Sequence, residues 1–113
     1  MTHAFFTTGH IKKIHVTEPK DPKKQASAVI LVQYGPPRES TGKAVEFVNA
    51  VMVRIPGYKW PSVKDKIAID KKVEIFGYLQ GVYKAVLDDG LFTTELVADK
   101  ITFEKEDSTP EAE

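Results

Sequence analysis

The sequence of 113 residues contains no cysteine. Disulfide bonds and thiolate metal sites are therefore excluded, and the absence fits an intracellular protein. No apolar run approaches the roughly 20 residues that a membrane-spanning helix needs. The N-terminus has no basic segment followed by an apolar one, so we expect no signal peptide. These absences favour a cytoplasmic protein, and the length favours a single domain.

Residues arranged for catalysis are also scarce. His3, His10 and His15 lie at spacings of seven and five without a nearby carboxylate, which argues against a metal site. There is no glycine-rich phosphate loop, and no serine lies in the sharp turn of a hydrolase nucleophile. Asp88 and Asp89 are interpreted as hairpin-turn residues and not as a catalytic pair. We therefore expect a binding protein that is not an enzyme and that uses no cofactor or metal.

The net charge of zero conceals an uneven distribution of charge. Residues 104–113 hold five acidic residues and one lysine, which leaves 15 basic and 11 acidic residues in 1–103. The body of the chain then carries about +4 and the end about −4. We expect a folded domain over 1–103 with a basic surface, followed by a short acidic, disordered tail over 104–113.

Five segments have the alternating or β-branched patterns of strands, with turn-forming residues between them. A short helix is expected over 62–69, because Pro61 suits a first helical position and Val63 and Ile67 share a face. The order predicts an all-β fold, a five-stranded oligonucleotide/oligosaccharide-binding (OB) barrel with one short helix between the third and fourth strands. A generic antiparallel sandwich is the alternative. The predicted strands are 9–16, 26–34, 45–55, 71–80 and 91–103.

The predicted strand 71–80 separates into two faces. Every second residue is apolar and is assigned to the core. Phe76 and Tyr78 then point outward, where they either stack bases or form a subunit interface. The predicted strand 45–55 is apolar on both faces, so it either lies under another layer or contacts a partner. The residues assigned to the core in the predicted strand 71–80 are Val73, Ile75, Gly77 and Leu79.

The segment VEIFGYLQ (73–80), a hairpin ending in DDG, and LFTTELVADKITF (91–103) together resemble the closing half of bacterial-type single-stranded DNA-binding proteins. The resemblance implies an OB barrel that binds and protects single-stranded DNA in replication, recombination or repair, usually as a homotetramer, with a dimer as the alternative. The chain lacks that family's acidic tip ending in Pro-Phe, which recruits partner enzymes. A short, divergent member, such as those that phages or mobile elements carry, is therefore expected.

A single strand offers phosphates to basic side chains and base faces to aromatic rings. Phe47 and Tyr83 lie near stacking positions of that family, and GYKWP (57–61) places Tyr58 and Trp60 on either side of Lys59. The candidate nucleic-acid-binding residues are the aromatic Tyr34, Phe47, Tyr58, Trp60, Tyr83 and Phe92 and the basic Lys12, Lys13, Arg54, Lys59, Lys71 and Lys72.

Each candidate also has a packing interpretation. Trp60, before Pro61, could act as a hydrophobic staple on the short helix, and Tyr34 could pack on the prolines that follow it. Other functions remain open: a protein-binding OB-fold adaptor, a primosomal-type replication accessory protein, or an RNA-binding barrel of the cold-shock type.

Overall fold

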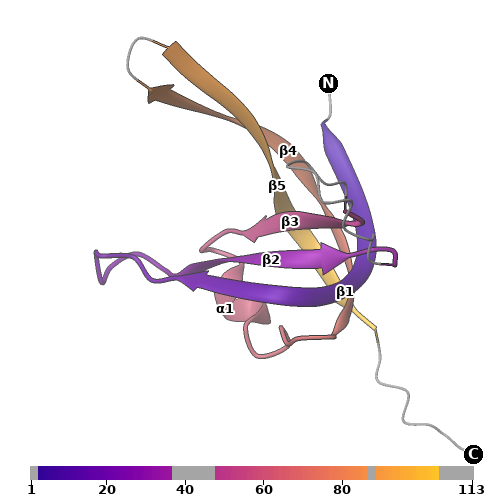
Figure 1. Cartoon of the computed structure of the whole chain (residues 1–113). Helices are drawn as coiled ribbons and strands as arrows, with labels where there is room; N and C mark the ends of the chain where they lie inside the picture. The colour runs from indigo at the N-terminus through magenta and orange to yellow at the C-terminus, as the bar shows by residue number, and fades with distance from the viewer. Residues whose placement is uncertain (1–2, 37–47, 87–88, 105–113) are drawn as a thin grey trace, which may run out of the picture.

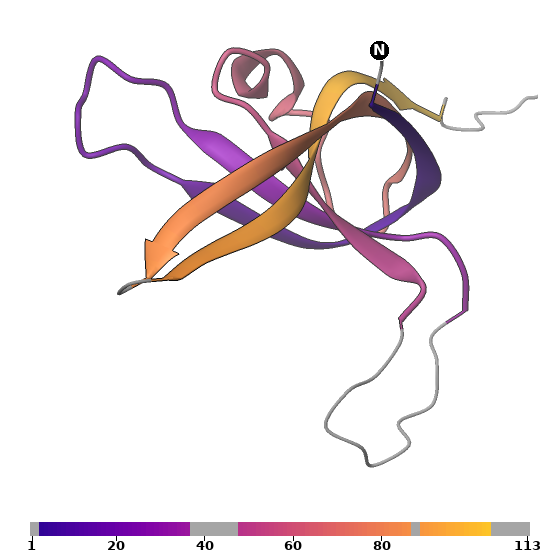
Figure 2. The ribbon, with the colours of Figure 1, turned by 90° about the horizontal axis from the view of Figure 1, so that it is seen from above.

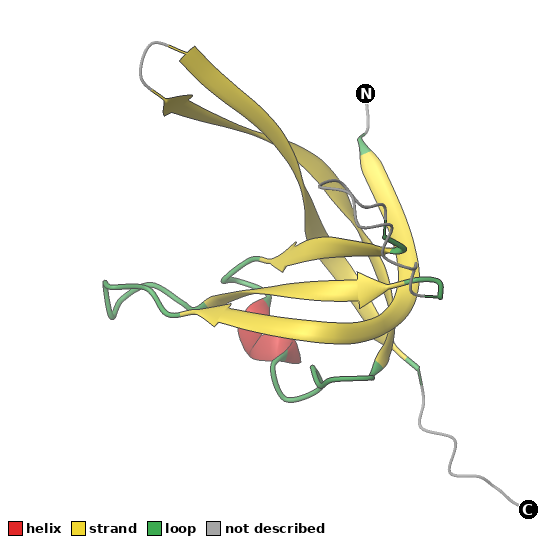
Figure 3. Cartoon of the chain, viewed as in Figure 1, coloured by secondary structure: helices red, strands yellow, loops and turns green. Residues whose placement is uncertain are grey.

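The computed structural model describes residues 3–36, 48–86 and 89–104. Within them, five strands form one sheet that closes on itself in the order β1-β2-β3-β5-β4, with one short helix between β3 and β4 (Figures 1 and 3). This arrangement confirms the predicted OB barrel. The predicted tail lies outside the described residues except for Glu104. The elements are β1 (Ala4–Thr17), β2 (Ser27–Gln33), β3 (Ala50–Ile55), α1 (Trp60–Val63), β4 (Lys72–Val86) and β5 (Asp89–Phe103).

β1 pairs with two different strands of the barrel, β4 and β2. Its first half, from Ala4 to His10, pairs antiparallel with β4, and its second half, from His10 to Thr17, pairs with β2. A bulge between Ile11 and Lys13 bends the strand from one partner to the other. The ring then closes through a short parallel contact between β3 and β5.

Branched aliphatic side chains fill the barrel. Along β2, the buried residues Ala28, Ile30 and Val32 alternate with half-exposed neighbours, as the period of a strand requires. Val53, Val73 and other inward residues of β1, β3 and β4 join them in one core cluster. The interior is therefore packed with side chains and leaves no room for a ligand-carrying channel in the described part of the chain.

α1 contributes to the core but is shorter than predicted. It covers Trp60–Val63, and Lys66 N–H then donates to the Val63 carbonyl, a tighter i→i+3 contact that ends the helix. Val63 is buried and Ile67 packs against the core, so the predicted shared face is confirmed. The predicted extent of 62–69 was wrong because the chain after Val63 continues as turns.

The hairpin of β4 and β5 is longer than predicted. β4 continues to Val86, which pairs with Asp89, so most of the segment interpreted as a connection is strand. Asp89 is thus the first residue of β5, while Asp88 lies outside the described residues. The hairpin projects beyond the barrel on the side of the β1–β2 connection (Figures 1 and 2).

The two faces of β4 follow the prediction as far as Gly77. Val73 and Ile75 are fully buried, whereas Phe76 and Tyr78 are exposed. Leu79 was assigned to the core but is 39% exposed. A bulge in the β4–β5 pairing between Phe76 and Gly77 marks where the hairpin leaves the barrel, and Leu79 lies beyond it.

Candidate nucleic-acid interface

Two exposed aromatic rings lie side by side on the projecting hairpin. Tyr83 on β4 and Phe92 on β5 are direct cross-strand partners. Their ring centroids are 4.8 Å apart with an interplanar angle of 52°. Phe92 is 77% exposed and Tyr83 is 57% exposed. Such a pair holds itself in place across the strands while leaving ring surface open to solvent.

The backbone of the hairpin determines where the Tyr83 ring lies. A Cβ atom at Gly90 would overlap that ring, so the ring occupies the space above Gly90. Residues two apart on a strand share a face, so Gly90 and Phe92 point to the same side of β5. The pair therefore lies on the face of the hairpin that also carries Leu79 and Leu96, and Leu96 packs against the core.

A second group of candidates surrounds a hollow of about 360 Å³ between β1, β4 and the end of β2. Lys12, Tyr34 and Lys72 line it. Tyr34 is positioned by its backbone N–H, which donates to the Asn49 carbonyl, and is 52% exposed. The other lining residues are Thr8, Gly9, His10, Gln33 and Gly35.

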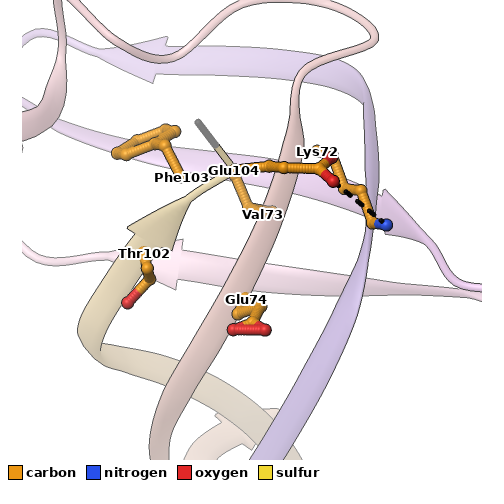
Figure 4. A pocket seen from close by; sticks show the side chains of 6 residues that line it. All are labelled: Lys72, Val73, Glu74, Thr102, Phe103 and Glu104. Carbon is orange, nitrogen blue, oxygen red and sulfur yellow. Dashed lines mark ion pairs between the residues drawn. The ribbon is translucent and has the colours of Figure 1, made fainter. Parts of the chain in front are cut away.

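Both lysines of this hollow have a carboxylate partner. Lys12 Nζ lies 2.6 Å from Asp70, and Lys72 Nζ lies 3.6 Å from Glu104, the contact drawn in Figure 4. The Lys12 hydrogen bond and charge hold the pKa of Asp70 below its ordinary value of 3.8. A phosphate that approached these lysines would therefore compete with a carboxylate that is already in place.

Figure 4 also shows the small hollow beside Lys72, at the barrel end of the hairpin. Its six lining residues come from β4, β5 and the residue after β5, and its volume is about 130 Å³. Ligand sites commonly have volumes of about 300–1,000 Å³. This hollow is too small for a nucleotide, so we do not assign it to the interface.

Three further basic candidates lie on β1, on β3 and just before β4, in different surroundings. Arg54 on β3 forms an ion pair of 3.2 Å with Glu95 on β5, which links the two parallel strands. The Lys71 carbonyl accepts from the Ile11 N–H, and Lys71 is half-buried. Lys13 is exposed on β1 beside the bulge.

The candidates around α1 divide into exposed and buried residues. Tyr58 is 65% exposed, and Lys59 occupies the N-cap position of α1. Trp60 is only 9% exposed and belongs to the core cluster, so the packing interpretation is the one the structure supports. The sixth aromatic candidate, Phe47, lies outside the described residues.

The candidate set omitted one exposed aromatic pair. Phe6 on β1 and Phe76 on β4 are cross-strand partners with ring centroids 4.6 Å apart. They are 52% and 54% exposed, and Tyr78 lies on the same side of β4. The alternation of β4 had placed Phe76 and Tyr78 outward. Phe6 lies in the part of β1 that precedes Gly9, the residue at which the first strand was predicted to begin.

Among the described residues, no group of three or more His, Asp or Glu side chains is arranged to hold a metal ion. In the same part of the chain, no helix has the length and apolar character needed to cross a membrane.

The barrel order and the short helix between β3 and β4 define an OB fold in the described part of the chain, and its structural neighbours include single-stranded DNA-binding proteins. One is the Plasmodium falciparum SSB in complex with ssDNA, with a TM-score of 0.65, 10% identity, and coverage of 92% of this chain and 96% of that one. Two others have the same fold at similarly low identity. They are the small single-stranded DNA-binding protein of Streptomyces coelicolor (TM-score 0.59, 9% identity, 92% and 95% covered) and the mitochondrial single-stranded DNA-binding protein Rim1 of S. cerevisiae (0.60, 10%, 91% and 95%).

At such identities the likeness establishes the shared fold. No protein-family model and no curated protein matches the sequence. The fold that the predicted resemblance implied is thus confirmed.

Proposed function

We propose that the chain binds single-stranded DNA without sequence preference and protects it during replication, recombination or repair, with no catalytic step. The observation that carries the proposal is the exposed Tyr83–Phe92 pair on a hairpin that projects from an OB barrel. Every base has a π-face, so rings of this kind bind bases of any sequence, at ~1–3 kcal/mol for each stacked base. The shared fold with proteins described as binding single-stranded DNA supports the proposal.

Basic side chains supply the contacts to phosphate. Lys13 is exposed on β1, and Lys12 and Lys72 line the hollow that also holds the exposed Tyr34. Arg54 takes part through the guanidinium donors that Glu95 does not use. Electrostatic contacts of this kind add affinity without reading sequence.

The chain acts as a homo-oligomer, with a tetramer favoured over a dimer, in the cytoplasm. The surface that supports assembly is the Phe6–Phe76 pair together with Tyr78, which form an exposed apolar group on β1 and β4. Exposed apolar groups of this kind commonly mark contact surfaces. A second copy of the chain is the partner we assign to it.

The same surface favours the alternative function, a protein-binding adaptor or a primosomal-type accessory protein. The deciding experiment is a fluorescence-anisotropy titration of labelled oligothymidine, with a duplex and an RNA oligomer of matched length as controls. We expect the single DNA strand to bind more tightly than the duplex. No binding, or equal binding of the duplex, would exclude the single-strand function and leave the adaptor.

A further inference from the structure

Gly81 lies in β4, two residues before Tyr83. The base position that we assign beside it rests on the proposed function. On the face that carries the aromatic pair, the cross-strand pairs follow one another along the hairpin as Leu79 with Leu96, Gly81 with Thr94, and Tyr83 with Phe92. Gly81 therefore interrupts a row of larger side chains immediately beside the two rings.

The space above Gly81 is open. A Cβ atom built there meets no atom within 4 Å, whereas one built at Gly90, on the other side of the rings, overlaps the ring of Tyr83. The two glycines of this face thus differ: Gly90 is covered by an aromatic ring of the chain itself, and Gly81 is covered by nothing in the described residues. Thr94, the cross-strand partner of Gly81, is exposed.

The gap has the length that a flat ring needs. Leu79 and Tyr83 are four residues apart, so their Cα atoms are separated by about 13 Å along the strand. A base with a van der Waals contact on each of its two faces needs about 7–8 Å. The remaining distance accommodates the thickness of the flanking side chains.

We propose that this gap receives one base of the bound strand, which stacks on the free face of the Phe92 ring above Gly81 and Thr94. Gly81 then belongs to the binding site because the absence of a side chain leaves space for the base. Gly90 is a positioning residue, because the Tyr83 ring that supports Phe92 lies in the space above it. The Thr94 hydroxyl, which both donates and accepts, can serve the edge of any base.

The test fills the gap. Gly81→Leu places a side chain where the base would lie. The variant is made in the full chain and is titrated with oligothymidine. Thr93→Leu is the matched control, because Thr93 pairs with Val82 and points to the opposite face of the hairpin. We expect Gly81→Leu to weaken binding about 5- to 150-fold, the loss that one stacked base represents. Thr93→Leu should bind as the parent does.

Two further readouts separate a blocked base from a damaged fold. Leucine has a higher strand propensity than glycine, so Gly81→Leu should melt at the same or a higher temperature than the parent by circular dichroism. The double variant Gly81→Leu with Phe92→Ala should lose no more affinity than the weaker-binding single variant, because both changes remove the same stacked base.

The outcomes are distinct. If the parent binds and Gly81→Leu binds equally well or more tightly, the proposed base position is wrong while the proposed function stands. Losses of Gly81→Leu and Phe92→Ala that add in the double variant would also overturn it, since the two residues would then act on different bases. If the parent itself does not bind oligothymidine, the proposed function fails and this inference fails with it.

Discussion

The ring of Phe5 occupies the space that a side chain at position 77 would need. The two residues are partners across β1 and β4, and a Cβ atom at Gly77 would lie 2.6 Å from Cε1 of Phe5 and would overlap the Val97 carbonyl oxygen. This contact lies beside the bulge where the β4–β5 hairpin leaves the barrel. The ring of Phe5 and the backbone of β5 thus both leave no room for a side chain at position 77.

Gly77→Ala should destabilise the protein strongly. The new methyl group meets backbone on one side, which cannot move as freely as a side chain, and overpacking of this kind costs about 1–3 kcal/mol or more. Chemical denaturation followed by circular dichroism measures the free energy of unfolding. Gly81→Ala is the control, since a Cβ there meets nothing within 4 Å. Equal stability of the two variants would show that the barrel adjusts at Gly77 and that the close contact is not restrictive.

Removing either exposed hairpin ring should weaken DNA binding without unfolding the protein. Phe92→Ala and Tyr83→Ala each remove ring surface that a base can cover, at a cost of about 1–3 kcal/mol in binding free energy. Oligothymidine titration measures the loss, and melting curves check the fold. Trp60→Phe supplies the contrast, because Trp60 is buried: it should lower stability and leave affinity unchanged. If the affinity fell only in the Trp60 variant, Trp60 and not the Tyr83–Phe92 pair would be the ring that binds DNA.

The Phe6–Phe76 pair should control assembly before it affects DNA binding. Replacing both residues by alanine removes two exposed rings from the surface assigned to a second copy of the chain. Light scattering should give a lower mass for the double variant than for the parent. A parent that already has the mass of a monomer at micromolar concentration would contradict the assembly, and so would a double variant with the parent's mass.

The Lys12–Asp70 ion pair should give a pH-dependent contribution to stability. The pKa of Asp70 is held below 3.8 in the folded protein, chiefly by the hydrogen bond from Lys12 and then by its charge. A carboxylate with a lowered folded pKa stabilises the protein above its unfolded pKa, and this contribution is lost as the pH falls through the folded value. Because the pair is exposed, the effect should be small and should weaken with added salt.

Asp70→Asn is the appropriate variant for this measurement. Asp70 has a φ of 69°, a left-handed conformation that asparagine adopts more readily than most residues, so the change removes the charge and leaves the turn unstrained. The melting temperature of the parent should exceed that of Asp70→Asn at neutral pH, and the difference should shrink below pH 3.8. A difference that is constant with pH would assign the effect to the turn and not to the ion pair.

Local patterns in the sequence were sufficient for the barrel but not for the whole interface. The alternation around Val73 and Ile75 predicted which side chains enter the core, because burial on one face follows directly from the period of a strand. It failed at Leu79, where the hairpin bends away from the barrel. That bend depends on pairing with β5, which no local pattern contains.

Trp60 and Tyr83 also show that local sequence patterns do not determine which aromatic residues are exposed. Both are aromatic residues next to a lysine in the sequence, and Pro61 after Trp60 allows a packing role without establishing it. Trp60 is buried because α1 lies against the core, and Tyr83 is exposed because the hairpin projects beyond it. Only the three-dimensional arrangement of the elements distinguishes a ring packed in the core from a ring open to solvent.

The most direct test of the proposed function is the affinity of the parent chain for oligothymidine across a series of salt concentrations. If aromatic stacking and basic side chains act together, log Kd should rise linearly with log salt, with a slope of about 0.7 for each phosphate that is neutralised, and binding should persist at high salt through stacking. An affinity that does not change between low and moderate salt would contradict the contribution of the lysines. No binding at low salt would contradict the single-strand function itself.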